Sequence, residues 1–69
     1  MGDRVYKMIE IVGTSKVGVD DAIKQAVAKA SKSVQHMGWL EVVSTRGHIV
    51  DGKVDHLQVT IKIGFRIED

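Results

Sequence analysis

In the stretch from Val54 to Ile67, apolar residues stand at every second position from Leu57 onward. A two-residue period is typical of a strand with one buried and one exposed face. Such a row of large apolar side chains needs a surface to pack against, and only the middle of the chain offers one. We therefore expect a long strand over residues 54–67, whose polar face carries Gln58 and Arg66. The apolar positions are Leu57, Val59, Ile61, Ile63, Phe65 and Ile67.

The middle of the chain has the pattern of a helix. Apolar residues recur there at three- and four-residue spacing, from Val19 to Val34, and many of them are alanines that let a sheet approach closely. We expect the helix to start at Lys16 or Val19, after a cap from Thr14 or Ser15, because their hydroxyls accept backbone N–H groups. We expect it to end near His36, with Gly38 as a left-handed cap.

The remaining segments complete an α+β fold in the order β-α-β-β, as one domain over residues 1–69. The first strand is expected over 4–12 and the second over 39–50, and Asp51-Gly52 is a strong hairpin signal. With the third strand in the middle, every neighbouring pair is antiparallel and one face of the sheet packs on the helix. The other face, which is largely polar, is left bare in a single copy.

The register of the hairpin decides where Arg46 points. A plain two-residue turn pairs Arg46 with Leu57 and would aim the guanidinium at the core, which is costly for a charge. A one-residue bulge instead brings Arg46 opposite Gln58. We therefore predict a bulge or a wider loop between Arg46 and Val54, with Gly47 as a plausible site for it.

Length and composition limit the possible classes of protein. A chain of 69 residues has a marginal core, and without cysteine it has no disulfide to reinforce it, so we expect oligomerisation. The net charge of +1 argues against a general polyanion binder. No apolar run approaches the roughly 20 residues of a membrane span, and no signal peptide is visible, so we expect a cytoplasmic protein with no membrane or nucleic-acid partner.

Four side chains are candidates for ligand binding. Trp39, the only tryptophan, offers a flat π face for a planar ligand, although lone tryptophans usually pack in a core or at its rim. Gln58 has the donor and acceptor needed to read a heterocycle edge, although on a strand it is more often simply solvated. Arg46 and Arg66 suit a phosphate, although surface salt bridges are the commoner use. His48 and His56 flank the hairpin, but a metal there lacks further obvious ligands.

Several segments together resemble the dodecin family. They are VYKMIEIVGTS at the start, GWLEV at the helix–strand junction, RGHIVDGKV at the hairpin and LQVTIKIGFRIED at the end. Each is a weak motif alone, but they occur in the right order over nearly the whole chain. The resemblance implies a three-stranded antiparallel sheet wrapped around one helix, assembled into a hollow homododecamer.

The resemblance also implies a flavin, which could be FMN, FAD, riboflavin or lumichrome, bound in pairs at two-fold interfaces. Trp39 matches the stacking tryptophan, Gln58 the glutamine on the pyrimidine edge, and Arg46 the arginine of the hairpin strand. Lys7 and Arg66 match positions near the ligand's phosphate. Similar bacterial dodecins also carry coenzyme A, for which the candidate contacts are Arg4, Tyr6, Lys29 and Lys32.

Two residues depart from the family pattern. Leu40 stands where an aromatic residue is common, and Gly38 stands where a polar residue is common. We expect both to change the wall of the flavin pocket.

The function that follows from the resemblance is flavin storage, buffering and photoprotection without enzymatic activity, because a ring stacked on both faces leaves no face for a substrate. A flavin-dependent oxidoreductase is one alternative, although no acid–base pair is evident in the sequence. A small nucleic-acid-binding module and a purely structural shell are the others.

Overall fold

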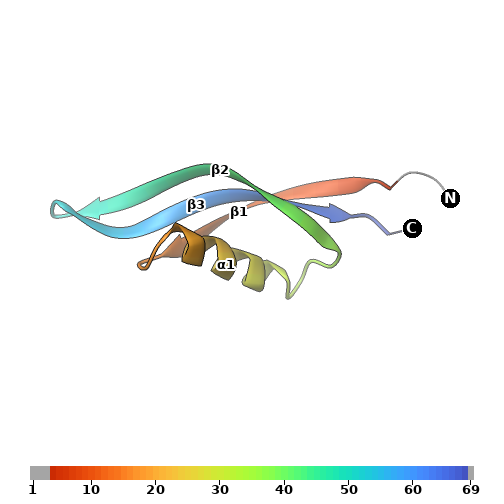
Figure 1. The fold of residues 1–69 in the computed structure, drawn as a ribbon, viewed down its shortest axis with the longest axis horizontal. Helices are drawn as coiled ribbons and strands as arrows, with labels where there is room; N and C mark the ends of the chain where they lie inside the picture. Colours follow the sequence, from red (N-terminus) through yellow and green to blue (C-terminus); the bar gives the residue numbers. More distant parts are fainter. Residues whose placement is uncertain (1–3, 69) are drawn as a thin grey trace.

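Three antiparallel strands and one helix form the part of the chain that the computed structural model describes, residues 4–68 (Figure 1). The elements are β1 (Tyr6–Ser15), α1 (Val19–Ala30), β2 (Met37–Val50) and β3 (Lys53–Arg66). The sheet order is β1-β3-β2, and both neighbouring pairs are antiparallel. The predicted α+β fold with the last strand in the centre is thus confirmed. Within residues 4–68, no helix is both long enough and apolar enough to cross a bilayer.

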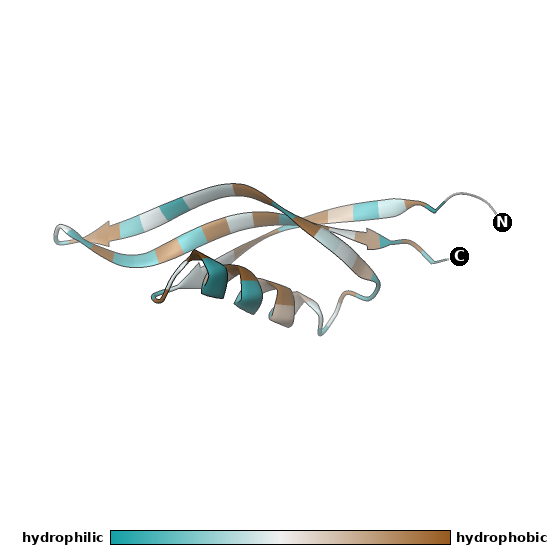
Figure 2. Ribbon diagram, viewed as in Figure 1, coloured by the Kyte–Doolittle hydropathy of each residue, from teal (hydrophilic) through white to brown (hydrophobic). Residues whose placement is uncertain are grey.

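Apolar residues at alternate positions of β3 form the centre of the core, and Figure 2 shows the alternating colours along this strand. Val59, Ile61 and Ile63 are fully buried and pack against the helix residues Ala22 and Ala26. The small alanines allow a close approach: a β-carbon on Gly13 of β1 would lie 2.9 Å from the β-carbon of Ala26. The close packing of helix and sheet therefore rests on small residues on both surfaces.

The helix is shorter than the periodicity predicted. It ends at Ala30, followed by a turn in which Val34 donates to the Ala30 carbonyl, and it does not extend to His36. The left-handed residue of this connection is His36, with φ of 64°, and the prediction that Gly38 caps the helix is wrong. Gly38 belongs to β2. A glycine after a helical pattern marks a cap or a strand bulge equally well, and here it marks the bulge.

The start of the helix is organised by Ser15. Its hydroxyl accepts the backbone N–H groups of Val17 (2.9 Å) and Gly18 (3.3 Å), and it donates to Asp21 (2.6 Å). The N-cap residue itself is Gly18, which has no side chain to act as a cap. Ser15, one of the two predicted capping residues, thus accepts backbone N–H groups as predicted, but it does so in the turn before the helix and not at the N-cap position.

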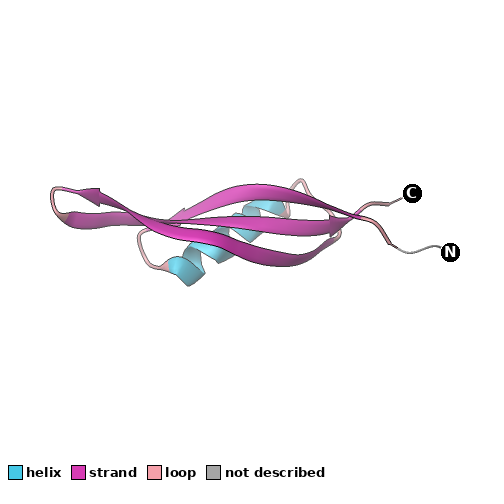
Figure 3. Cartoon of the chain, turned by 90° about the horizontal axis from the view of Figure 1, so that it is seen from above, coloured by secondary structure: helices cyan, strands magenta, loops and turns pink. Residues whose placement is uncertain are grey.

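The hairpin between β2 and β3 extends well beyond the helix (Figures 1 and 3). Asp51 and Gly52 have φ of 51° and 75°, the left-handed conformation that a tight hairpin turn of this kind requires. The predicted hairpin signal is therefore confirmed.

The surface of one copy is large for its mass. It exposes 5209 Å², whereas a compact monomer of 7.6 kDa would expose about 4300 Å². Because α1 packs on β1 and β3, apolar residues such as Leu40 and Val42 stay exposed on the helix side of β2. A copy of this shape is suited to burying that surface in an assembly.

Candidate functional site

The candidate site lies on the face of the sheet that points away from α1, called here the outer face. Residues paired across antiparallel strands share a face, so the register assigns each side chain. β3 contributes Gln58, Lys62 and Arg66 to the outer face, and Ile61 and Ile63 to the inner face. The remaining outer-face positions are Tyr6, Met8, Glu10, Val12 and Thr14 of β1, His56, Thr60 and Gly64 of β3, and Trp39, Glu41, Ser44, Arg46 and His48 of β2.

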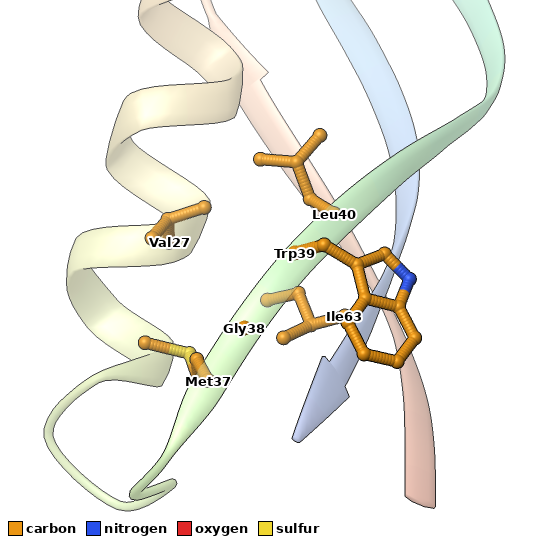
Figure 4. A pocket seen from close by; sticks show the side chains of 6 residues that line it. All are labelled: Val27, Met37, Gly38, Trp39, Leu40 and Ile63. Atoms are coloured by element: carbon orange, nitrogen blue, oxygen red, sulfur yellow. The ribbon is translucent and has the colours of Figure 1, made fainter. Parts of the chain in front are cut away.

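Trp39 reaches the outer face because of a bulge at Gly38. Met37 pairs with Phe65 and Trp39 pairs with Gly64, so Gly38 is the extra residue between them. The bulge turns Met37 toward the core and Trp39 away from it. Figure 4 shows the indole of Trp39 directed away from the helix, whereas Met37 lies beside the helix. Trp39 is therefore not a core residue, and 45% of its surface is exposed.

The indole rests on a surface prepared for it. Its six-membered ring lies directly over Gly64, where a β-carbon would overlap it. Tyr6 of β1 packs against it edge-on, with ring centroids 5.1 Å apart and 66° between the planes. These two contacts hold the ring in place and still leave 45% of the Trp39 surface exposed, and an exposed indole can stack a planar ligand.

A second bulge, at Val43, keeps Trp39 and Arg46 on one face. The two residues are seven positions apart, so a regular strand would place them on opposite faces. Val42 pairs with Ile61 and Ser44 with Thr60, which makes Val43 the extra residue. This bulge was not predicted, because nothing in Glu41-Val42-Val43-Ser44 distinguishes it from a regular strand.

A third bulge sets the hairpin register and confirms the predicted pairing of Arg46 with Gln58. The irregularity lies between His48 and Ile49 on β2 and leaves Asp55 unpaired on β3. It is therefore not at Gly47, which pairs normally with Leu57. Arg46 consequently lies on the outer face and is exposed, as the cost of burying its charge demands.

Gln58 belongs to a chain of hydrogen bonds along the edge of the hairpin. Its Nε2 lies 3.2 Å from Nε2 of His56, and Nδ1 of His56 lies 2.7 Å from Oδ2 of Asp55. The hydrogen bond from His56, reinforced by the charge of Lys16, lowers the pKa of Asp55. His48 stacks on His56 with ring centroids 5.1 Å apart, so the two histidines do approach each other across the hairpin.

The other end of the outer face is basic. Arg66 donates from Nε to Glu68 (2.6 Å), and its Nη2 lies 3.3 Å from Nδ1 of His36. The hydrogen bond from Arg66, together with the charges of Arg66, His36 and Arg4, lowers the pKa of Glu68. Arg66 follows Gly64 by two residues on the same face, so its strand position neighbours the one that carries the indole, while its guanidinium contacts Glu68 and His36.

The remaining predicted residues do not gather in one copy. Lys7 pairs with Phe65 and so lies on the inner face, opposite to Trp39. Tyr6 lies on the outer face, whereas Lys29 and Lys32 belong to the last turn of α1 and the residues after it. Arg4 precedes β1. The four candidate coenzyme A contacts are thus divided between both sides of the sheet.

An apolar cavity of about 270 Å³ lies on the helix side, between α1 and β2 (Figure 4). Trp39, Gly38 and Leu40 all line it, together with Val27, Met37 and Ile63. Leu40 pairs with the buried Ile63 and so lies on the inner face, at the same cavity as Trp39. That Leu40 and Gly38 change the wall of a flavin pocket stays a prediction.

Comparison with known proteins gives one consistent result. The family model Dodecin matches residues 5–68. Dodecin of Thermus thermophilus is 44% identical over 66 residues, which cover 96% of each chain. The structure of dodecin from Streptomyces coelicolor matches with a TM-score of 0.93 at 46% identity, over 100% of this chain and 99% of that one.

A more distant structure is named for a different ligand. It is calcium dodecin, a calcium-chelating immunodominant antigen of Mycobacterium tuberculosis with a calcium-binding site. It matches at a TM-score of 0.82 and 28% identity, over 93% of this chain and 91% of that one. The ligand of the present chain therefore has to be argued from its own residues.

Proposed function

The chain belongs to the dodecin family, and from this premise we propose that it binds a flavin, FMN or riboflavin, on the outer face of its sheet. We propose that it stores and buffers the flavin and performs no turnover. The observation that carries the proposal is the indole of Trp39, held over Gly64 and against Tyr6 with 45% of its surface exposed. An exposed aromatic ring on a largely polar face is suited to stacking the isoalloxazine.

The polar contacts proposed for the ligand come from the same face. The amide of Gln58 has a donor and an acceptor for the pyrimidine edge of the ring, and Arg46 lies directly opposite it. Arg66 lies next to the platform, where its guanidinium suits the phosphate of FMN.

One copy does not bring these groups to one ring. Gly64, which carries the platform, and Gln58 are six residues apart on β3, which corresponds to about 20 Å of strand. Three fused six-membered rings span much less. The proposed site therefore combines Trp39 of one copy with Gln58 of another, and a two-fold axis provides that combination twice. The excess exposed surface of a single copy supports such an assembly, which we propose is the hollow homododecamer.

The proposed arrangement favours storage over catalysis. A two-fold axis brings two indoles and two flavins together, so each flavin is covered on both faces. A covered ring has no face left for a hydride donor or an oxidisable substrate. An indole in van der Waals contact with an excited flavin can donate an electron to it, which would quench the fluorescence and protect against light.

A fluorescence titration tests the proposal. Riboflavin and FMN are titrated into the protein after its mass in solution has been measured, and the matched variants are Trp39→Ala and Val17→Ala, the latter at a loop position that is 87% exposed. We expect strong quenching near one flavin per chain in a dodecamer. Trp39→Ala should weaken binding roughly tenfold or more, since stacking on an aromatic ring contributes on the order of 1–3 kcal/mol per heterocycle. Val17→Ala should leave it unchanged.

Two outcomes contradict the proposal. Unchanged affinity and quenching in Trp39→Ala would eliminate the stacking site. Reduction of the bound flavin by a nicotinamide cofactor, followed by repeated turnover, would make the protein an oxidoreductase instead.

A further inference from the structure

We propose that His56 is a positioning residue for the ligand. It fixes the orientation of the Gln58 amide, and so makes the site selective for a ring edge with an N–H group beside a carbonyl, the imide edge of a flavin. The inference rests on the proposed function. The inference adds His56, a residue outside the proposed stacking and phosphate contacts. It is argued from the hydrogen bonds that join Asp55, His56 and Gln58.

Asp55 determines which nitrogen of His56 carries the proton. A carboxylate can only accept hydrogen bonds, so the 2.7 Å contact between Asp55 Oδ2 and His56 Nδ1 requires the proton on Nδ1. Consecutive residues of a regular strand point to opposite faces. The bulge at Asp55 removes this restriction and lets its carboxylate reach the neighbouring ring.

The second nitrogen of His56 then determines the orientation of Gln58. With Nδ1 protonated, Nε2 of a neutral imidazole is an acceptor, so the group facing it at 3.2 Å is the amide nitrogen of Gln58. The amide is left with its carbonyl oxygen and its second N–H for a ligand. If the amide were reversed, its oxygen would face the lone pair of His56, which the fixed tautomer disfavours.

The ring of His56 is itself held in place. His48 lies directly opposite it on β2 and stacks on it, with ring centroids 5.1 Å apart and 30° between the planes. With a neutral His56, the chain from Asp55 through His56 to Gln58 therefore has one orientation at each step. An amide that is already oriented before binding loses less rotamer freedom when the ligand arrives. The free-energy cost of binding is therefore smaller and the affinity is higher.

The fixed amide gives the site a directional preference. Oε1 of Gln58 accepts the imide N–H of the flavin, and the free N–H donates to the adjacent carbonyl. A ligand methylated at this nitrogen leaves Oε1 without a donor in a desolvated contact, which costs affinity. The preference for riboflavin over N3-methylriboflavin therefore measures the orientation of the amide.

Quenching titrations with riboflavin and N3-methylriboflavin test the inference on the assembled protein. The variants are His56→Leu, which removes both nitrogens, and Asp55→Asn, which keeps the shape but permits either tautomer. Asp51→Asn is the control, because it removes one carboxylate at the hairpin turn, outside the chain of hydrogen bonds. The wild type should bind riboflavin about tenfold or more tightly than N3-methylriboflavin. His56→Leu and Asp55→Asn should each weaken the binding of riboflavin roughly three- to tenfold and leave the binding of N3-methylriboflavin nearly unchanged.

A double-mutant cycle separates positioning from a general effect on the fold. In a Gln58→Leu background, His56→Leu should have no further effect on riboflavin binding, because the group that it positions is gone. A second readout needs no ligand: the ¹⁵N shifts of the His56 ring should report a protonated Nδ1 in the wild type. They should report a mixture of tautomers in Asp55→Asn.

The outcomes distinguish this inference from the proposed function. Quenching by the wild type with an unchanged ligand preference in both variants would overturn the positioning role while the flavin site stands. Additive effects of His56→Leu and Gln58→Leu, or a protonated Nε2 in the neutral ring, would overturn it too. If the wild type quenches neither flavin, the proposed function fails and the inference fails with it.

Discussion

The six-membered ring of Trp39 lies over Gly64, in the space where any other residue would carry its β-carbon. A β-carbon there would overlap three atoms of the indole. The contact links β2 to β3 on the outer face, and the edge-on packing of Tyr6 extends it to β1. The platform for the proposed ligand thus depends on a residue that has no side chain.

Replacing Gly64 with alanine should displace the indole while the fold remains. The clash involves the far end of a side chain that can rotate away, so the free energy of unfolding should change little. We expect flavin binding to weaken about tenfold or more, because the stacking surface moves. Tryptophan emission and a flavin titration measure the two effects. The control is Gly18→Ala, where an added β-carbon meets no atom within 4 Å. Unchanged flavin affinity in Gly64→Ala would argue against the supported platform.

Replacing Gly13 with alanine should destabilise the fold itself. The added β-carbon would overlap the carbonyl oxygen of Ala22 and lie 2.9 Å from the β-carbon of Ala26, and neither neighbour can rotate away. Overpacking of this kind typically costs about 1–3 kcal/mol. Chemical denaturation of the variant beside Gly18→Ala measures the difference. Equal stability of the two variants would mean that helix and sheet are less tightly packed than described.

Replacing Ser15 with alanine should raise the pKa of Asp21. The hydrogen bond from Ser15 is the main reason that the pKa of Asp21 lies below its ordinary value, with a second contribution from Gln25. A carboxyl whose folded pKa is lowered stabilises the fold above its unfolded pKa, near pH 4, and this stabilisation is lost as the pH falls through the folded pKa. Carboxyl-carbon NMR titration follows Asp21 directly.

The stability that the variant loses relative to the wild type should therefore shrink on acidification, because protonation of Asp21 removes the stabilisation that the Ser15 hydrogen bond gives to its carboxylate. Ser31→Ala is the matched control, since that hydroxyl donates to the Ala28 carbonyl and not to a carboxylate. If the Asp21 titration is the same in both variants, the hydrogen bond from Ser15 does not control it.

Replacing Arg66 with alanine should distinguish FMN from riboflavin. Arg66 lies two residues after Gly64 on the outer face and its guanidinium is held by Glu68, so we propose that it contacts the phosphate of a ligand stacked on Trp39. We expect FMN to bind roughly tenfold more weakly and riboflavin to bind as before, because only FMN carries the charge that Arg66 would meet. Lys53→Ala, at the hairpin end of β3, controls for a general loss of positive charge. Equal losses for the two flavins would place Arg66 away from the phosphate.

The sequence predicted those features that follow from short-range patterns. The alternation of Leu57 to Phe65 indicated the central strand, and Asp51-Gly52 indicated the hairpin. The cost of burying Arg46 indicated that a bulge must correct the register, and the pairing with Gln58 is confirmed. Each of these inferences needed only a period, a turn propensity or a desolvation cost.

Features that depend on tertiary packing were not predictable in this way. The helix pattern continues past Ala30, but the chain turns there to bring Met37 against the core. The bulge at Val43 leaves no local signal and the one at Gly38 only an ambiguous glycine, because an extra residue in a strand is defined by what lies opposite it on β3. The hydrogen bonds from Asp55 to Gln58 were missed for the same reason, since they depend on a bulge at Asp55.

Because of the bulge at Val43, the number of residues between Trp39 and Arg46 decides whether both side chains lie on the outer face, whatever those residues are. Each single-residue insertion or deletion between Trp39 and Arg46 reverses the parity of the strand, and would turn one of these two side chains over to the helix side. Substitutions between them leave the parity unchanged. Comparable proteins with the same ligand geometry should therefore vary in the identity of these intervening residues and keep their number, so that spacing, more than any single residue, identifies the site in a sequence.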